Sequence, residues 1–373
     1  MQTKVLISII IIFVFISFSY GFFSGHYKFF PFEQIQNIKN NFSSTDLDKS
    51  QFDKEFIKPD IKSMIQIQNQ EDIFSKRQNL TQFIWKNNGY PISKLPTNII
   101  QNFEDSRFEQ FSNLNRIDKL VIEMNLGIKS NGYLFIPDLS NKKLIIYQQG
   151  HAGDFFLGEK TIQFFLKKGF TVLALSMPLI EPNNQPFVKI EEFGEIKFNS
   201  HNYFKFLESE NFSPISYFLD PIIISLNYLE QNFKFDSYSI IGISGGGWST
   251  VLISALDERI SNSYSVAGSL PIFLRSIPEN FGDYEQTNPD LYKITNYLEL
   301  YILASYGENR KFIQIFNKYD PCCFSGELYK TYEIEIKEIM SELKGEFFIH
   351  LDDSHKEHKI SENALKLIDK LYL

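Results

Sequence analysis

The sequence predicts an α/β fold: a mostly parallel sheet with helices on both faces, an N-terminal helical extension and a cap-like insertion. This prediction rests on the pattern along the chain. From residue 116 to the C-terminus, short runs rich in β-branched and aromatic residues alternate with segments of helical period. Such alternation supplies the right-handed crossovers that parallel strands require. The 373 residues are enough for one large domain or two small ones.

The first 22 residues are typical of a secretory signal peptide. Lys4 precedes an apolar run, and Ser19 and Gly21 offer a cleavage site. The alternative is an uncleaved single-pass anchor, because Phe22–Phe23 lengthen the apolar stretch towards the span of a bilayer. We therefore expect a secreted or secretory-lumen protein, which contacts a membrane only if this segment is retained. Three glycosylation sequons are consistent with a glycoprotein: Asn41, Asn79 and Asn211.

Residues 23–115 show no β alternation and are expected to form a helical extension, with helical patches at 53–70 and 80–85. Residues 116–373 are expected to form the main domain. It should open with two paired strands, 118–126 and 132–136, joined by a turn at 129–132. The remaining strands are expected at 143–148, 170–175, 239–243, 263–267, 311–316 and 346–351, and helices at 160–168, 218–233, 327–343 and 361–371. Gly169 should close the helix that begins at 160, and Ser361 should cap the last helix. An aromatic insertion, 269–309, separates two of these strands.

The stretch Ser237–Leu256 carries the clearest chemical signal. A β-branched strand breaks at a glycine-rich turn and continues as a helix. Gly242 and Gly246 lie two residues either side of Ser244, as required when a tight turn brings strand and helix backbones together. A phosphate-binding loop is the alternative, but no Lys follows the glycines and the spacing fits neither common phosphate-loop motif. Ser244 is therefore predicted to be a nucleophile.

A nucleophilic serine needs a general base, and the base needs a carboxylate partner. In a parallel sheet these groups belong at the carboxyl ends of strands. Two such ends lie downstream: residues 317–321, which contain Asp320, and residues 352–358, which contain acidic residues and two histidines. The order along the chain is therefore Ser, Asp, His.

The glycine-flanked Ser244, this order and the Gly150-His151 turn resemble the α/β-hydrolase superfamily over residues 116–373. The resemblance implies a triad of Ser244, Asp320 and His358, with His355 as the alternative base. Asp352 and Asp353 are the alternative acids, but they share the loop of the histidines. The implied oxyanion-hole donors are the backbone N–H of Gly245 and that of His151 or Ala152. His350 is expected to be structural, and His26 and His201, which precede the serine, receive no triad role.

The only cysteines, Cys322 and Cys323, are adjacent and cannot form a disulfide framework. They can be free thiols, a vicinal disulfide or half of an intermolecular bridge. A redox-sensitive clasp on the acid loop is one interpretation, and two small buried residues are the favoured alternative. Two cysteines alone make a poor zinc site, so no metal and no cofactor are expected. A net charge of −8 without a basic run argues against a nucleic-acid partner.

The expected activity is hydrolysis of a carboxylic ester through an acyl-enzyme, with a small-molecule or acyl substrate. One alternative is a peptidase of the prolyl-oligopeptidase type, although the N-terminal segment is too short and too helical for a propeller gate. The other is a non-catalytic binding protein on the same fold. The insertion 269–309 could serve a lipase or form a simple cap. Within it, Arg275 could bind an anionic group, with a solvated surface arginine as the favoured alternative.

Overall fold

The computed structural model describes residues 13, 15, 17–21, 59–275 and 280–371. The chain divides into two compact units, Met1–Glu55 and Phe56–Leu373, and the second contains the fold described below. Most of the expected signal peptide or anchor, the sequon at Asn41 and the first part of the expected helix 53–70 lie outside the described residues. In the part of the chain that the structure describes, no helix is sufficiently long and apolar to cross a bilayer.

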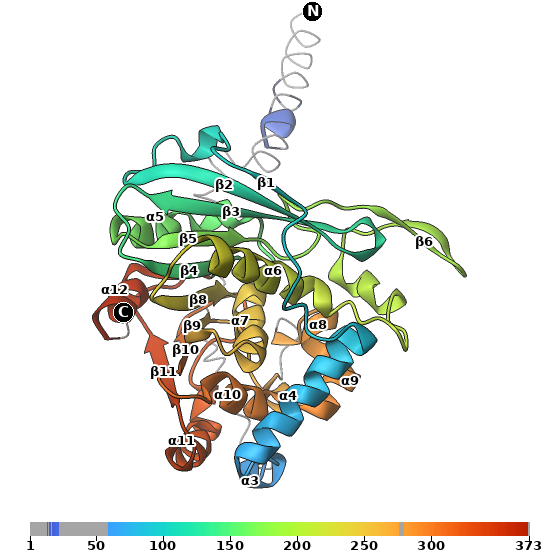
Figure 1. The fold of residues 1–373 in the computed structure, drawn as a ribbon, viewed down its shortest axis with the longest axis vertical. Coiled ribbons are helices and arrows are strands. Elements are labelled where there is room, and N and C mark those ends of the chain that lie inside the picture. Colours follow the sequence, from blue (N-terminus) through green and yellow to red (C-terminus); the bar gives the residue numbers. More distant parts are fainter. Residues whose placement is uncertain (1–12, 14, 16, 22–58, 276–279, 372–373) are drawn as a thin grey trace, which may run out of the picture. The chain divides into compact units, whose positions relative to one another are not determined.

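A nine-stranded sheet forms the centre of the described residues, in the order β1-β2-β3-β5-β4-β8-β9-β10-β11 (Figure 1). From β5 to β11 neighbouring strands are parallel, whereas β1, β2 and β3 add an antiparallel edge. The strands are β1 (Asn98–Ile100), β2 (Leu114–Glu123), β3 (Lys129–Pro137), β4 (Lys143–Gln148), β5 (Thr171–Leu175), β8 (Ser237–Ile243), β9 (Ile260–Val266), β10 (Lys311–Asn317) and β11 (Glu346–Asp352). The predicted α/β fold and its parallel strands are therefore confirmed.

Helices cover both faces of this sheet, because the central strands are apolar on both sides. Helices α5 and α12 share one core with Ile145, Tyr147 and Ile241 of the sheet. On the other face α7 packs against β8 and β9, and α6 and α10 pack against α7. The helices are α3 (Ile61–Met64), α4 (Gln70–Trp85), α5 (Glu159–Lys167), α6 (Ser216–Asn232), α7 (Gly245–Leu256), α8 (Tyr284–Thr287), α9 (Pro289–Ile294), α10 (Tyr297–Ser305), α11 (Glu333–Glu342) and α12 (Glu362–Leu371).

The two expected helix boundaries are present. Gly169 has a φ of 83° just beyond α5, a conformation that glycine adopts without a steric penalty. Ser361 Oγ accepts a hydrogen bond from the backbone N–H of Ala364 at 3.0 Å, as an N-cap residue does. The long helix expected at 327–343 is shorter than predicted, because residues 328–331 form a separate 3₁₀ turn before α11.

The described part of the N-terminal extension contains helices, as expected, and also one short strand. Strand β1 pairs with β2 and belongs to the main sheet. Its three residues are too few to show an alternating pattern. Helix α4 begins at Gln70, well before the expected patch 80–85, and a capping box at Asn69 fixes this start. Only the four residues of α3 are helical in the described part of the other patch, 53–70, before α4 begins.

Arg77 anchors helix α4 to the domain. Its guanidinium is buried and donates to the backbone carbonyls of Ala255, Leu303 and Tyr306 at 2.8, 3.1 and 3.3 Å. It also pairs with Glu258. Burial lowers the pKa of Arg77. From residue 56 on, the extension belongs to the same compact unit as the sheet, and the boundary expected at residue 116 falls inside that unit.

The turn between β2 and β3 lies earlier than predicted. Residues 129–132 are extended and paired with β2, whereas the chain reverses at Asn125–Gly127. There Leu126 and Gly127 have φ values of 59° and 74°. Asn131-Gly132 resembles a hairpin turn in sequence. Gly132, however, pairs with Leu120 inside the β2–β3 ladder, and a Cβ on it would lie 2.8 Å from the side-chain atom Leu175 Cδ2 of β5.

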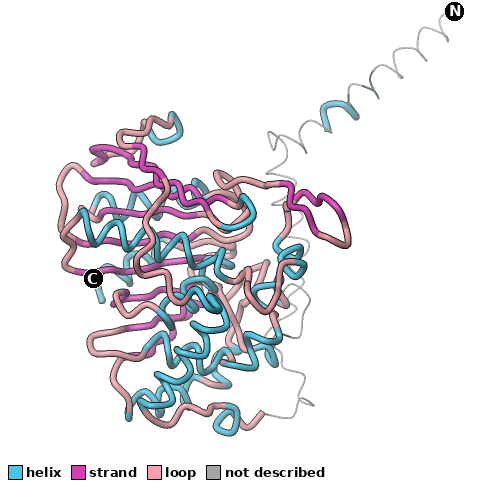
Figure 2. Tube along the Cα trace, turned by 45° about the vertical axis from the view of Figure 1, so that its right-hand side comes forward, coloured by secondary structure: helices cyan, strands magenta, loops and turns pink. Residues whose placement is uncertain are grey.

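Two segments extend beyond the expected pattern. Strands β6 (Phe187–Ile190) and β7 (Gly194–Lys197) form a separate hairpin, which extends away from the main sheet (Figure 2). In the insertion 269–309, residues 276–279 lie outside the described residues. Its last helix, α10, is buried against α7 and belongs to the helical layer. The cap-like part is therefore limited to the residues before α10.

Candidate active site

Ser244 lies on a sharp turn between β8 and α7. Its φ and ψ are 56° and −127°, a conformation that a residue with a Cβ rarely adopts. The backbone N–H of Ser244 donates to Val266 O at 3.0 Å, which ties the turn to β9. Gly245 begins α7, so its backbone N–H has no acceptor within the helix. The turn thus presents a serine beside a free backbone donor.

The close backbone approach predicted around this turn is confirmed. A Cβ on Gly242 would lie 2.1 Å from Gly246 O, and a Cβ on Gly246 would lie 2.1 Å from Gln148 O. A Cβ on Gly150 would lie 2.6 Å from the Cβ of Ser244. Backbone atoms cannot move aside as a flexible side chain can, so the geometry of Ser244 depends on all three glycines.

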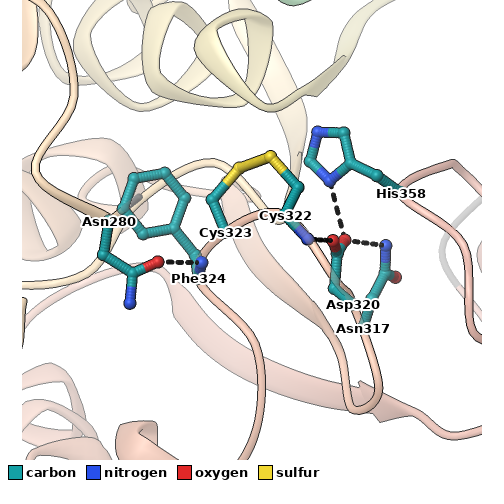
Figure 3. The surroundings of a disulfide bond; sticks show 7 residues. All are labelled: Asn280, Asn317, Asp320, Cys322, Cys323, Phe324 and His358. Carbon is teal, nitrogen blue, oxygen red and sulfur yellow. Dashed lines mark hydrogen bonds and ion pairs between the residues drawn. A yellow bond between two sulfur atoms is a disulfide. The ribbon is translucent and has the colours of Figure 1, made fainter. Parts of the chain in front are cut away.

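Asp320 and His358 form a hydrogen-bonded pair (Figure 3). His358 Nδ1 lies 2.7 Å from Asp320 Oδ2, and the carboxylate also accepts from Cys322 N at 2.9 Å and Asn317 Nδ2 at 3.1 Å. Asp320 is 3% exposed. Asp320 follows β10 and His358 follows β11, at the same edge of the sheet at which Ser244 follows β8. His358 Nε2 is buried and has no hydrogen-bond partner among the described residues.

The second histidine of this loop has a different partner. His355 Nε2 lies 3.5 Å from Asp352 Oδ2, and its Nδ1 accepts from the backbone N–H of Glu357 at 3.2 Å. Asp352 in turn accepts from Ser354 and Ser361, and Asp353 is exposed. The structure thus brings Asp320 together with His358 and not with His355. The remaining candidate, His350, lies within β11.

Cys322 and Cys323 form a disulfide in this structure (Figure 3). Their sulfur atoms and a ring nitrogen of His358 lie within 4.8 Å of one another. The disulfide therefore borders the loop that holds Asp320, and Phe324, the next residue, donates its backbone N–H to Asn280 Oδ1 at 2.5 Å.

The turn after β4 lies directly against Ser244. The ring of His151 is so near to Gly245 that a Cβ there would lie 2.5 Å from His151 Nδ1. Neither His151 nor Ala152 donates its backbone N–H to an acceptor in the described part of the chain. Both therefore remain candidates for the second oxyanion-hole donor.

A cluster around the side chain of His151 was not predicted from the sequence. His151 Nε2 lies 3.0 Å from both His201 Nδ1 and Glu285 Oε1, and 3.5 Å from Asp283 Oδ2. Burial lowers the pKa of His151, but the hydrogen bond and charge of Glu285 outweigh burial and leave this pKa raised. Burial raises the pKa of Glu285, but the two histidines outweigh it and leave this pKa lowered. The four residues come from three distant segments, so no sequence spacing could reveal them.

Arg275 is not a solvated surface residue, so the favoured expectation for it is wrong. It is 5% exposed and donates to the backbone carbonyls of Leu270 and Phe281 at 2.8 and 3.0 Å. Its guanidinium carbon lies 4.4 Å from the ring centroid of Tyr297. Arg275 thus links two parts of the insertion, around Leu270 and around Phe281.

Comparison with known proteins identifies the fold. An acetyl xylan esterase from Thermoanaerobacterium sp. JW/SL YS485 superposes with a TM-score of 0.54 at 15% identity, over 80% of this chain and 92% of that one. An acetyl xylan esterase from Paenibacillus sp. R4 gives a TM-score of 0.49 at 15% identity, over 81% and 94% of the two chains. An S-formylglutathione hydrolase from Agrobacterium tumefaciens gives 0.47 at 15%, over 73% and 95%. No family model matches the sequence, and no curated protein matches it.

The chain therefore has the α/β-hydrolase fold, as the first of these superpositions and the sheet order indicate. At 15% identity the similarity concerns the fold, and fold alone does not determine the reaction. The reaction must be argued from the residues of the site.

Proposed function

We propose that this protein is a secreted serine hydrolase that cleaves carboxylic esters through an acyl-enzyme. The observation that carries the proposal is the Asp320–His358 hydrogen bond at the sheet edge that also bears Ser244 on its strained turn. A buried carboxylate that holds one ring nitrogen of a histidine leaves the other nitrogen available as a base. The esterases with the same fold are consistent with ester chemistry.

In the proposed reaction Ser244 Oγ attacks the acyl carbon while His358 Nε2 takes its proton. Asp320 accepts the Nδ1–H of His358 and stabilises the imidazolium that forms. The backbone N–H groups of Gly245 and of His151 or Ala152 stabilise the oxyanion; loss of one such donor costs on the order of 100-fold in rate. The alcohol leaves with the proton from His358. Water then attacks the acyl-enzyme, with His358 again as the base, and the acid is released from Ser244.

Covalent labelling tests this proposal directly. A fluorophosphonate probe should label the folded wild-type protein at Ser244, and Ser244→Ala should remain unlabelled. A folded wild type that does not react would refute the serine-hydrolase proposal. For a reactive protein, p-nitrophenyl esters of increasing acyl length and proline-containing peptide amides distinguish an esterase from a lipase and from a peptidase.

The identity of the base can be tested with a matched pair of variants. His358→Ala should lose turnover, because Asp320 then has no imidazole to orient. His355→Ala should keep most of it, because its partner is Asp352. Turnover that survives His358→Ala but not His355→Ala would reverse this assignment.

Secretion is a separate part of the proposal and needs its own measurement. The full chain expressed in secreting cells should appear in the medium with a new N-terminus near residue 22, and deglycosylation should lower its apparent mass. Both Asn79 and Asn211 are exposed and accessible to glycosylation. Retention of the intact chain in the membrane fraction would instead support the single-pass anchor.

A further inference from the structure

Four side chains of metal-binding types lie close together, and the ring of one of them, His151, lies against Gly245, the residue after Ser244. His151 comes from the turn after β4, and His201 begins the 3₁₀ helix η5 (His201–Phe206). Asp283 immediately precedes α8, and Glu285 lies within it. One nitrogen or oxygen from each side chain lies within 4.8 Å of every other. Two imidazoles and two carboxylates in this arrangement are typical zinc ligands.

The buried members of this cluster direct free electron pairs at one another. Glu285 is fully buried, and its Oε2 has no hydrogen-bond partner among the described residues. His201 is 4% exposed, and its Nε2 lies 2.7 Å from the carbonyl of Pro178. Since a carbonyl can only accept, Nε2 carries the proton and donates it. In the neutral ring, Nδ1 is then an unprotonated nitrogen that faces the cluster.

With the ring of His201 neutral, hydrogen bonds alone leave the cluster incompletely satisfied. His151 Nε2 can carry one proton, yet two acceptors lie 3.0 Å from it: His201 Nδ1 and Glu285 Oε1. The same nitrogen cannot fully satisfy both, and Glu285 Oε2 remains without a donor. Buried polar atoms without partners are costly, so an ion that satisfies all of them would stabilise the site.

We propose that His151, His201, Glu285 and Asp283 bind a zinc ion. Ligand atoms 2.0–2.2 Å from a tetrahedral zinc would lie about 3.4 Å from one another. The distances from His151 Nε2 to His201 Nδ1 and to Asp283 Oδ2 are 3.0 and 3.5 Å, and His201 Nδ1 lies 3.9 Å from Asp283 Oδ2. Small side-chain adjustments would bring these atoms into a tetrahedral arrangement. The Pro178 carbonyl supplies the outer hydrogen bond that orients many zinc-binding histidines.

The zinc ion would hold the cap-like segment over the proposed site. His151, His201 and Asp283 line a cleft of about 640 Å³, and the ring of His151 contacts Gly245. Coordination would join the turn after β4, η5 and α8, which are otherwise linked here by hydrogen bonds. It would fix the turn that offers His151 or Ala152 as an oxyanion-hole donor. This role is independent of which ester the protein cleaves.

Metal content of the full chain, purified without chelator, tests the inference. Mass spectrometry of the metals should find about one zinc per chain, and zinc added to chelator-treated protein should raise its melting temperature. Glu285→Gln and Asp283→Asn should each weaken zinc binding in calorimetry by at least about 100-fold, more than the loss of an outer-shell partner. Asp283 is the safer position to change, because its side chain is 38% exposed.

Asp290→Asn is the matched control, because Asp290 is an exposed carboxylate of the same segment that pairs with Lys293. It should bind zinc as the wild type does. A folded wild type that contains no zinc and binds none on titration overturns the proposal; the cluster is then a hydrogen-bonded network of histidines and carboxylates. Zinc that binds equally to wild type, Glu285→Gln and Asp283→Asn also overturns it, because the ion must then lie elsewhere.

Discussion

Asp220 offers a stability test that can be worked out from the structure. This α6 residue is 7% exposed and accepts a hydrogen bond from Trp85 Nε1 of α4 at 2.7 Å. Burial raises the pKa of Asp220 from 3.8 to about 6, against the opposing effects of the Trp85 hydrogen bond and the charge of Lys94. The folded protein therefore holds this proton more tightly than the unfolded chain does.

The sign of the pH dependence follows from this difference. The favourable contribution of the protonated Asp220 is complete below pH 4 and is lost as the pH rises through about 6. A shift of two pKa units corresponds to about 3 kcal/mol. Asp220→Asn keeps an oxygen acceptor for Trp85 and removes the charge. At pH 8 the variant should therefore be more stable than the wild type by up to about 3 kcal/mol.

Urea denaturation between pH 4.5 and 8 measures this effect. Trp85 is one of only two tryptophans in the chain, so fluorescence reports on the interaction itself. The difference between variant and wild type should grow with pH, whereas that of Asp236→Asn, an exposed carboxyl, should stay constant. An Asp220→Asn protein that is less stable than the wild type at pH 8, or a difference that does not vary with pH, would refute the reasoning.

Three further predictions concern the site and its support. Gly246→Ala should abolish labelling of Ser244, because the new Cβ would lie 2.1 Å from a backbone oxygen; wild-type labelling would contradict the proposed role of this glycine. Asp320→Asn should lower kcat on the order of 10⁴-fold with little change in KM, whereas Asp352→Asn should lower it less than tenfold. Equal losses in the two variants would argue against the assigned acid. Arg77→Ala should lower the free energy of unfolding by about 2–4 kcal/mol, because it leaves buried carbonyls unpaired. Chemical denaturation measures this value. An unchanged free energy of unfolding would mean that Arg77 does not anchor α4.

The parallel strands and the serine turn could be predicted because each carries a local signal. A buried parallel strand is a continuous apolar run, as in residues 144–147 of β4, and the glycines around Ser244 follow from backbone crowding. The Asp320–His358 contact could be anticipated from position alone, since both residues follow strands at one sheet edge.

The sequence-based predictions fail where tertiary contacts override local signals. Asn131-Gly132 has the sequence of a turn, but both residues are paired with β2 inside the sheet. Strand β1 has only three residues, and its partner, not its composition, makes it a strand. The cluster of His151, His201 and Glu285 was invisible because folding alone brings its members together.

The placement of two buried arginines has an electrostatic consequence for the serine turn. Arg77 and Arg310 donate to Ala255 O and Ser254 O, at the carboxyl end of α7. A helix carries a partial negative charge at this end and a partial positive charge at the other. The two guanidinium groups offset the negative pole, while the positive pole beside Ser244 lies about 18 Å away. Because the negative end of α7 is offset, it reduces the field of the positive end only slightly. The positive end therefore favours the negative charge that develops on an attacked ester.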